Sequence, residues 1–252
     1  MGTSLAGNLL LAMLPGFAWL AWFLHKDRYE PEPRGLIARA VFYGMVAFAL
    51  SRCAETRADA ALAGALGLFA LPRWAHLAFL VAPFEELAKF AVVRLRFYPD
   101  PEFNEPVDGI VYATSVGIGF ATLENAVYMQ SAGAGVLVMR ALSATLMHLG
   151  CSGLIGHALG RQKFARGHGV RRLRIAIAGS ILLHAGFDLL VTFGPGEAGP
   201  LRATVILGAL AAFLIGLFSR LDIEIEEDLE RSPFRPKPKK SGIMAPPEGG
   251  RP

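Results

Sequence analysis

Seven apolar stretches, each about long enough to cross a lipid bilayer, constrain this chain more than any other feature of its sequence. A membrane-spanning helix needs roughly 20 apolar residues, because it rises about 1.5 Å per residue through a hydrocarbon core about 30 Å thick. A further apolar piece, 58–71, is shorter and could lie in the interface or re-enter the membrane. We therefore predict an all-α polytopic membrane protein, a bundle of about seven transmembrane helices, or eight if 58–71 also spans. The seven predicted spans are 5–24, 36–51, 74–93, 106–129, 136–160, 175–193 and 201–219.

The composition agrees with a membrane protein. Hydrophobic residues make up 53% of the 252 residues, and the mean hydropathy of +0.42 is high for a soluble domain. The net charge of +4 could suggest nucleic acid, but Lys and Arg lie mainly between the apolar runs. We therefore expect a membrane environment and no nucleic-acid partner. The two cysteines, Cys53 and Cys151, lie in different segments and give neither a disulfide framework nor a paired-cysteine metal site.

Loop charge predicts the orientation, because the cytoplasmic loops of membrane proteins carry an excess of Lys and Arg. Basic residues follow the first, third, fifth and seventh predicted spans, whereas the connections after the fourth and sixth spans carry none. We therefore predict an outer N-terminus and a cytoplasmic C-terminus. The connection after the second span is the weak point, since it holds Arg52, Arg57 and Arg73. The last segment, 221–252, begins acidic and ends basic and proline-rich, which predicts a membrane domain at 1–220 and a disordered cytoplasmic tail at 221–252.

The third span carries three ionisable residues, Glu85, Glu86 and Lys89, close to its middle. A charge at the bilayer centre costs about 3 kcal/mol on insertion scales, so an intramembrane cluster of this kind indicates a functional site. Lys89 lies at i+4 from Glu85 and at i+3 from Glu86, so it can reach either carboxylate. A structural ion pair is the alternative, but one glutamate would suffice for it and the second would lack a partner.

The fourth span adds Asp108 near its start and Glu124 with Asn125 further along. Asp108 could cap the helix or belong to a loop, and we leave both roles open beside a supporting role at the site. Glu124 is a further carboxylate within an apolar run, and the neighbouring Asn125 can donate and accept hydrogen bonds. We expect Arg140, near the outer end of the next span, to snorkel toward the interface.

The fifth and sixth spans supply His148, His184 and Asp188. His148 alone could be a hydrogen-bonded packing residue, and we expect Cys151, one turn further on, to be a small buried residue. His184 and Asp188 lie at i and i+4, so the carboxylate can orient the imidazole, join it in a metal site, or form a structural pair. In the predicted orientation these polar groups lie between the bilayer centre and the outer leaflet, which predicts a wet cavity that opens outward.

Carboxylates and histidines without an evident serine or cysteine nucleophile suit the activation of water, and peptide hydrolysis inside the membrane fits this set best. We expect Glu85 or Glu86 to be the general base, Lys89 to tune the pair, and Glu124 and His148 to polarise or position water. His184 and Asp188 would bind the oxyanion or a metal. The cofactor is open: none, or a divalent metal such as zinc. The HExxH signature of zinc proteases is absent, and the candidate ligands are His148, His184, Asp188 and Glu124.

These residues lie in segments that resemble the ordered motif set of PrsW-type intramembrane proteases, which belong with the CAAX-protease and Abi superfamily. Phe120 is followed four residues later by Glu124, where CAAX-type members have a histidine and PrsW-type members are similar to this chain. The resemblance covers about residues 5–219. The segments that carry it are 27–33 (DRYEPEP), 85–89 (EELAK), 108–112 (DGIVY), 117–125 (GIGFATLEN), His148 and 184–188 (HAGFD).

The resemblance implies a multi-pass protease of the bacterial inner membrane with the double-glutamate motif at its catalytic centre. It also implies that the substrate is a membrane-anchored protein such as an anti-sigma factor, cut first on its extracytoplasmic side. Two alternatives stay open. Buried Glu, Lys and His also build proton-coupled transporters, although no internal repeat is visible. A non-enzymatic membrane regulator would explain the tail but leave the buried polar cluster without a purpose.

Overall fold

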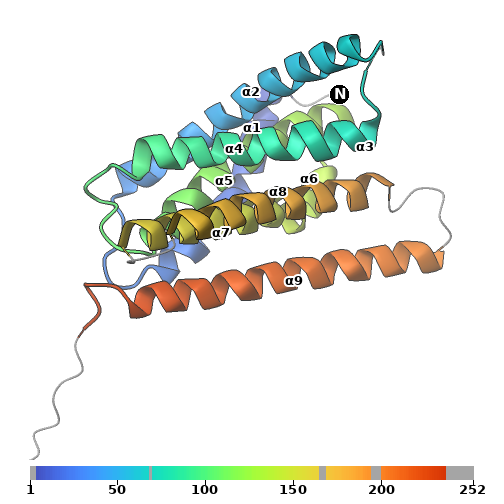
Figure 1. The fold of residues 1–252 in the computed structure, drawn as a ribbon. Coiled ribbons are helices and arrows are strands. Elements are labelled where there is room, and N and C mark those ends of the chain that lie inside the picture. The colour runs from blue at the N-terminus through green and yellow to red at the C-terminus, as the bar shows by residue number, and fades with distance from the viewer. Residues whose placement is uncertain (1–3, 68–69, 165–168, 194–199, 237–252) are drawn as a thin grey trace, which may run out of the picture.

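The computed structural model describes residues 4–67, 70–164, 169–193 and 200–236, and within these ranges the chain forms helices and no strand. The long helices run alongside one another as a bundle (Figure 1). This confirms the all-α prediction. In chain order the elements are α1 (Leu5–Lys26), α2 (Arg34–Ala65), α3 (Arg73–His76), η1 (Leu77–Val81), α4 (Ala82–Val92), η2 (Val93–Phe97), α5 (Asp108–Ala132), α6 (Val136–Leu142), α7 (Ala144–Phe164), α8 (Gly169–Phe193) and α9 (Pro200–Glu230).

Six helical segments of the described chain are long and apolar enough to cross a membrane: α1, α2, α5, the run of α6 and α7, α8 and α9. The remaining predicted span is a composite helix, in which α3, η1, α4 and η2 follow one another without a gap from Arg73 to Phe97. Its two π-helical turns divide it into short pieces. Pro83, at the start of α4, lacks the backbone N–H that an α-helical turn would use, which accounts for the π-helical turn before it.

The apolar piece 58–71 does not form a separate helix, because α2 continues through it as far as Ala65. Residues 68 and 69 lie outside the described residues. With 32 residues, α2 is about 48 Å long at about 1.5 Å per residue. It therefore exceeds the thickness of the hydrocarbon core, and its last turns reach the end of the bundle next to the start of α3.

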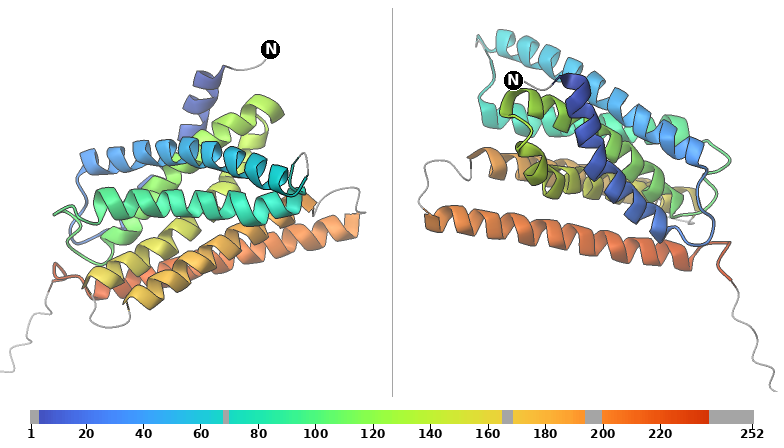
Figure 2. Two further views of the ribbon diagram at one scale, coloured as in Figure 1. Left: turned by 45° about the horizontal axis from the view of Figure 1, so that its top comes forward. Right: turned by 180° about the vertical axis from the view of Figure 1, so that it is seen from behind.

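Helix α5 is the centre of the bundle and packs against α1, α2 and α7. Seen from behind, α1 crosses α5 obliquely (Figure 2). Glycines let the backbones meet: a Cβ added at Gly119 would lie 1.8 Å from the carbonyl oxygen of Val41, and one at Gly109 would lie 2.2 Å from that of Gly156. Because these contacts leave no room for a side chain, they fix α5, and with it Glu124, against α2 and α7.

Within the described residues, the first turn of α1 and the last turn of α9 lie at opposite ends of the bundle. One end carries the α1–α2 connection, the η2–α5 connection and the last turn of α9, and the opposite end carries the first turn of α1, the start of α3 and the end of α8 (Figure 1). By the loop charges, the first of these ends faces the cytoplasm. That assignment stays a prediction.

The predicted start of a disordered tail at residue 221 is wrong, because α9 continues to Glu230. Leu221, Ile225 and Leu229 recur on one face of α9 and are buried. Two of the acidic residues between them have partners on other helices, at 2.5 Å from Lys26 to Asp222 and 2.8 Å from His157 to Asp228. The many acidic residues in this part of the sequence made the amphipathic pattern hard to recognise. The proline-rich part of the predicted tail, from residue 237, lies outside the described residues.

Candidate active site

The two adjacent glutamates of α4 have different surroundings, although both are buried. The Lys89 ammonium lies 2.6 Å from Glu86 Oε1, so the lysine pairs with the second glutamate and not with the first. Glu85 has no lysine partner, and its Oε2 has no hydrogen bond among the described residues. The sequence left the choice open. The structure assigns the ion pair to Glu86 and leaves Glu85 facing the cavity described below.

His184 lies between the two glutamates. Its Nδ1 is 2.7 Å from Glu86 Oε1, and its Nε2 is 3.7 Å from Glu85 Oε2 and 3.5 Å from Asp188 Oδ2. Because Glu86 also accepts a hydrogen bond from Lys89, it is an ionised acceptor, and Nδ1 must therefore be the donor. With the proton on Nδ1, Nε2 is the nitrogen that carries the lone pair of a neutral imidazole, and it lies on the side of Glu85 and Asp188.

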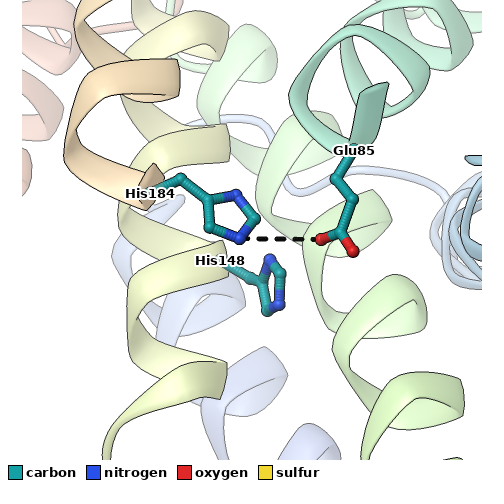
Figure 3. A group of neighbouring side chains, drawn as sticks. All are labelled: Glu85, His148 and His184. Atoms are coloured by element: carbon teal, nitrogen blue, oxygen red, sulfur yellow. Dashed lines mark ion pairs between the residues drawn. The ribbon is translucent and has the colours of Figure 1, made fainter. Parts of the chain in front are cut away.

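His148 is held at both ring nitrogens. Lys89 donates to its Nδ1 over 3.1 Å, and its Nε2 lies 2.8 Å from Glu124 Oε2. An ammonium group can only donate, so Nδ1 accepts and Nε2–H donates to Glu124. The side chains of Glu85, His148 and His184 come from α4, α7 and α8 and point toward one another (Figure 3). The two imidazole rings lie edge to face, with centroids 5.0 Å apart.

Arg140 belongs to this constellation, so the prediction that it snorkels is wrong. Its Nη2 lies 2.7 Å from Glu124 Oε2, and its Nε donates to Asn125 Oδ1 over 2.7 Å. The guanidinium also lies 3.8 Å from the centre of the Tyr128 ring. The short helix α6 positions this arginine beside α5. The sequence held one signal for this pair. Glu124 lies in an apolar helix that contains no Lys or Arg, so a cation that pairs with it had to come from another helix.

These contacts form one continuous series across five helices, which we call the polar chain. It runs from Arg140 on α6 through Glu124 on α5, His148 on α7, and Lys89 and Glu86 on α4, to His184 on α8. Cations and anions alternate in it with a neutral imidazole between them. Each buried charge therefore has a partner of opposite sign, which is the condition for keeping it ionised in an apolar bundle.

A cavity of about 670 Å³ opens beside the polar chain. Glu85, Glu124, His148 and Asp188 supply its polar floor, and apolar side chains such as Phe48 supply its walls. The lining reaches the end of the bundle where α3 begins and α8 ends. This is the end that the loop charges place outside. Polar residues that we did not predict also line it, among them Arg52, which pairs over 2.8 Å with the buried Glu55 on the same face of α2.

Asp108 is not part of this cavity. It lies at the opposite end of α5, about 24 Å from Glu124 along the helix at about 1.5 Å per residue. Its Oδ2 accepts hydrogen bonds from the backbone N–H groups of Asn104 and Glu105, so it orders the turn before α5. The predicted supporting role at the site therefore does not fit its position. The loop role that the sequence left open does.

The family model of the PrsW family of intramembrane metalloproteases matches residues 32–217. The chain belongs to this family. A protein named Protease PrsW from Geobacillus kaustophilus is 37% identical over 183 residues, which cover 70% of this chain and 76% of the relative. Its namesake from Bacillus subtilis is 32% identical over 180 residues, with 71% and 79% covered. No solved structure matches.

Membership of the family decides between the alternatives left open by the sequence. The chain is an intramembrane protease of the bacterial inner membrane, and its substrates are membrane proteins. A transporter or a non-enzymatic regulator would not account for the match. The buried polar cluster is the candidate site for this activity.

The family's description as metalloproteases raises the question of whether the residues here could hold a metal. Glu85, His148 and His184 each offer one ligand atom, and these atoms lie within 4.8 Å of one another. Two histidines and one glutamate form a donor set of catalytic zinc sites. Glu86 behind His184 Nδ1 is the carboxylate that typically orients a metal-bound histidine. The set fits a divalent ion, with Glu85 and His184 Nε2 free to ligate it and His148 available once it releases Lys89 or Glu124.

Proposed function

We propose that Glu85 is the general base of the peptide hydrolysis and that Glu86 is not. The position of Glu85 carries this proposal: it lines the cavity and Glu86 does not, although the Oε2 atoms of both lack a hydrogen bond among the described residues. Glu86 accepts from Lys89 and from His184 through its Oε1, so protonation of this carboxylate would weaken two charge-assisted contacts. A divalent ion held by His148, His184 and one carboxylate oxygen of Glu85 would lower the pKa of the attacking water, and the other oxygen of Glu85 would remain the base.

In the proposed reaction Glu85 takes a proton from a water molecule, and the water oxygen attacks the carbonyl carbon of the scissile peptide bond. The proton then passes to the amide nitrogen, the C–N bond breaks, and a carboxyl group and an amine are released. Glu86 and Asp188 hold the His184 ring so that Nε2 faces the reacting carbonyl. Because Nε2 carries the lone pair, the ring would act on the oxyanion as a ligand of a bound divalent ion and not as a hydrogen-bond donor.

His148 and the groups behind it act as positioning residues in this scheme. Glu124 accepts a hydrogen bond from His148 Nε2–H. Arg140 pairs with Glu124 and holds it in place, and Asn125 in turn accepts a hydrogen bond from Arg140. The arrangement fixes one tautomer of His148 and keeps the ring edge beside the cavity. Asn125 also donates to Thr145 Oγ1 over 3.0 Å, which ties α5 to the start of α7.

We further propose that the substrate is a single-span membrane protein such as an anti-sigma factor, cut on the extracytoplasmic side of its span. The position of the cavity supports this, since it reaches the end of the bundle that the loop charges place outside. We also propose that the protease domain, predicted as 1–220, includes all of α9 to Glu230, because the buried face of α9 packs against the bundle.

Cleavage of a single-span substrate by the purified chain in detergent tests the proposed base. We expect Glu85→Gln to abolish cleavage and to keep the wild-type unfolding temperature. Glu230→Gln, an exposed glutamate at the far end of α9, is the matched control and should cut like wild type. If Glu85→Gln and Glu86→Gln both cut at the wild-type rate, the assignment is wrong.

A further inference from the structure

Three arginines on the predicted outer side, Arg52, Arg57 and Arg73, run against the charge bias that orients membrane proteins. The orientation of the protein in the membrane therefore does not explain why arginines occur at these positions. Arg52 and Arg73 line the cavity, and Arg57 does not. The structure thus separates two arginines that face the substrate's path from one that does not.

Among the described residues that line the cavity, Arg73 is the arginine without a partner. Arg52 is neutralised by Glu55, and Arg140 by Glu124. Arg73 is exposed at the start of α3, and within the described residues its guanidinium has no ion pair or hydrogen bond. His76, on the same face one turn further on, lies 3.3 Å from Asp59. The outer rim of the cavity therefore carries an unmatched positive charge above a floor of carboxylates.

We propose that Arg73 is a specificity-determining residue, which binds an acidic side chain of the substrate on the extracytoplasmic side of the scissile bond. Arginine suits this role because its planar fork binds a carboxylate through two hydrogen bonds. The inference rests on the proposed function, since it takes Glu85 as the point of cleavage.

The spacing fixes where the acidic residue should lie. Arg73 and Glu85 are twelve residues apart on one composite helix, which is about 18 Å at about 1.5 Å per residue. An extended peptide advances about 3.4 Å per residue, so it covers that distance in about five residues. We therefore expect the preferred Asp or Glu about four to six residues outward from the scissile bond.

The test uses the purified full chain and a set of single-span substrates that differ only at outward positions one to eight, with Asp, Asn or Lys at each. We expect kcat/KM for Asp to exceed that for Asn about tenfold at positions four to six. Arg73→Gln should bring this ratio close to one, and Arg73→Glu should favour Lys over Asp. Arg57→Gln, an exposed arginine outside the cavity, should keep the wild-type ratio and rate.

The outcomes separate this inference from the proposed function. Equal cleavage of the Asp and Asn substrates by the wild type, or an unchanged ratio in Arg73→Gln, overturns the role of Arg73 and leaves the protease assignment of Glu85 intact. A preference lost equally in Arg57→Gln reduces the effect to general charge attraction and also overturns it. No cleavage of any substrate by the wild type, under conditions where the chain is folded, overturns both.

Discussion

Replacement of Lys89 by methionine should destabilise the folded chain strongly, because it leaves Glu86 as an uncompensated buried charge. Lys89 is 1% exposed and Glu86 is fully buried, and their charged atoms are 2.6 Å apart. At an effective dielectric constant of about 20, such a pair attracts with about 6 kcal/mol before desolvation is counted. Removing one partner of a buried pair costs about 3–5 kcal/mol. Methionine keeps the apolar stem, so packing is largely preserved.

Thermal unfolding of the purified variants in detergent measures this loss. For a chain of this size about 1 kcal/mol lowers the midpoint by roughly 2–4 °C, so Lys89→Met should lower it by at least about 6 °C. Lys26→Met is the matched control. Lys26 pairs with Asp222 over 2.5 Å, but both side chains are partly exposed, so the control should cost less than about 1 kcal/mol.

The double variant Lys89→Met/Glu86→Gln separates loss of the pair from loss of packing. With both charges gone, much of the stability should return, because no buried charge is left without a partner. A wild-type midpoint for Lys89→Met would refute the reasoning. So would a double variant that unfolds as early as the single one, since the cost would then come from the lost lysine packing and not from Glu86.

Three further predictions follow from the site and its surroundings. Arg140→Gln should lower kcat about 10- to 100-fold with little change in KM, because Glu124 then no longer holds His148, and a selective rise in KM would contradict this. Burial raises the pKa of Asp27 and of Glu32, in the α1–α2 connection, to about 7. Below about pH 7 both carboxyls thus stay protonated in the folded chain, whereas in the unfolded chain they ionise near pH 4. The unfolding midpoint in detergent should therefore fall as pH rises from about 4 to about 7. The fall should be smaller in Asp27→Asn/Glu32→Gln, which lacks both ionisable groups. A strong chelator should abolish cleavage and zinc should restore it, with about one ion per chain by elemental analysis and none retained by His184→Ala; full activity of a metal-free sample would refute the metal assignment.

The membrane spans and most residues of the candidate site could be predicted from the sequence, because each differs sharply in polarity from the residues around it. An apolar run of sufficient length specifies a span, and the charges Glu85, Glu86 and Lys89 stand out within one. The sequence could not predict which glutamate pairs with Lys89, because the i+3 and i+4 spacings both bring two side chains together on a helix. A residue on another helix determines which glutamate pairs with Lys89. His184 of α8, almost one hundred residues further on, contacts the same oxygen of Glu86, Oε1, as Lys89 does.

The other errors have related causes. Arg140 looked like an interfacial arginine because its partner Glu124 lies on another helix, and only the turn between α5 and α6 brings them together. Asp108 looked like a site residue because depth along α5 cannot be read from a motif, and it lies at the other end. The start of the tail was misplaced because charge composition outweighed the buried stripe from Leu221 to Leu229.

The central claim is that Glu85, and not its neighbour Glu86, takes the proton in the cavity. The most direct test is the cleavage rate of purified Glu85→Gln on a single-span substrate, measured beside Glu86→Gln at equal amounts of folded protein. We predict no detectable cleavage by Glu85→Gln and residual cleavage by Glu86→Gln, whose loss misorients His184 without removing the base. Cleavage by Glu85→Gln at or above the rate of Glu86→Gln would contradict the account.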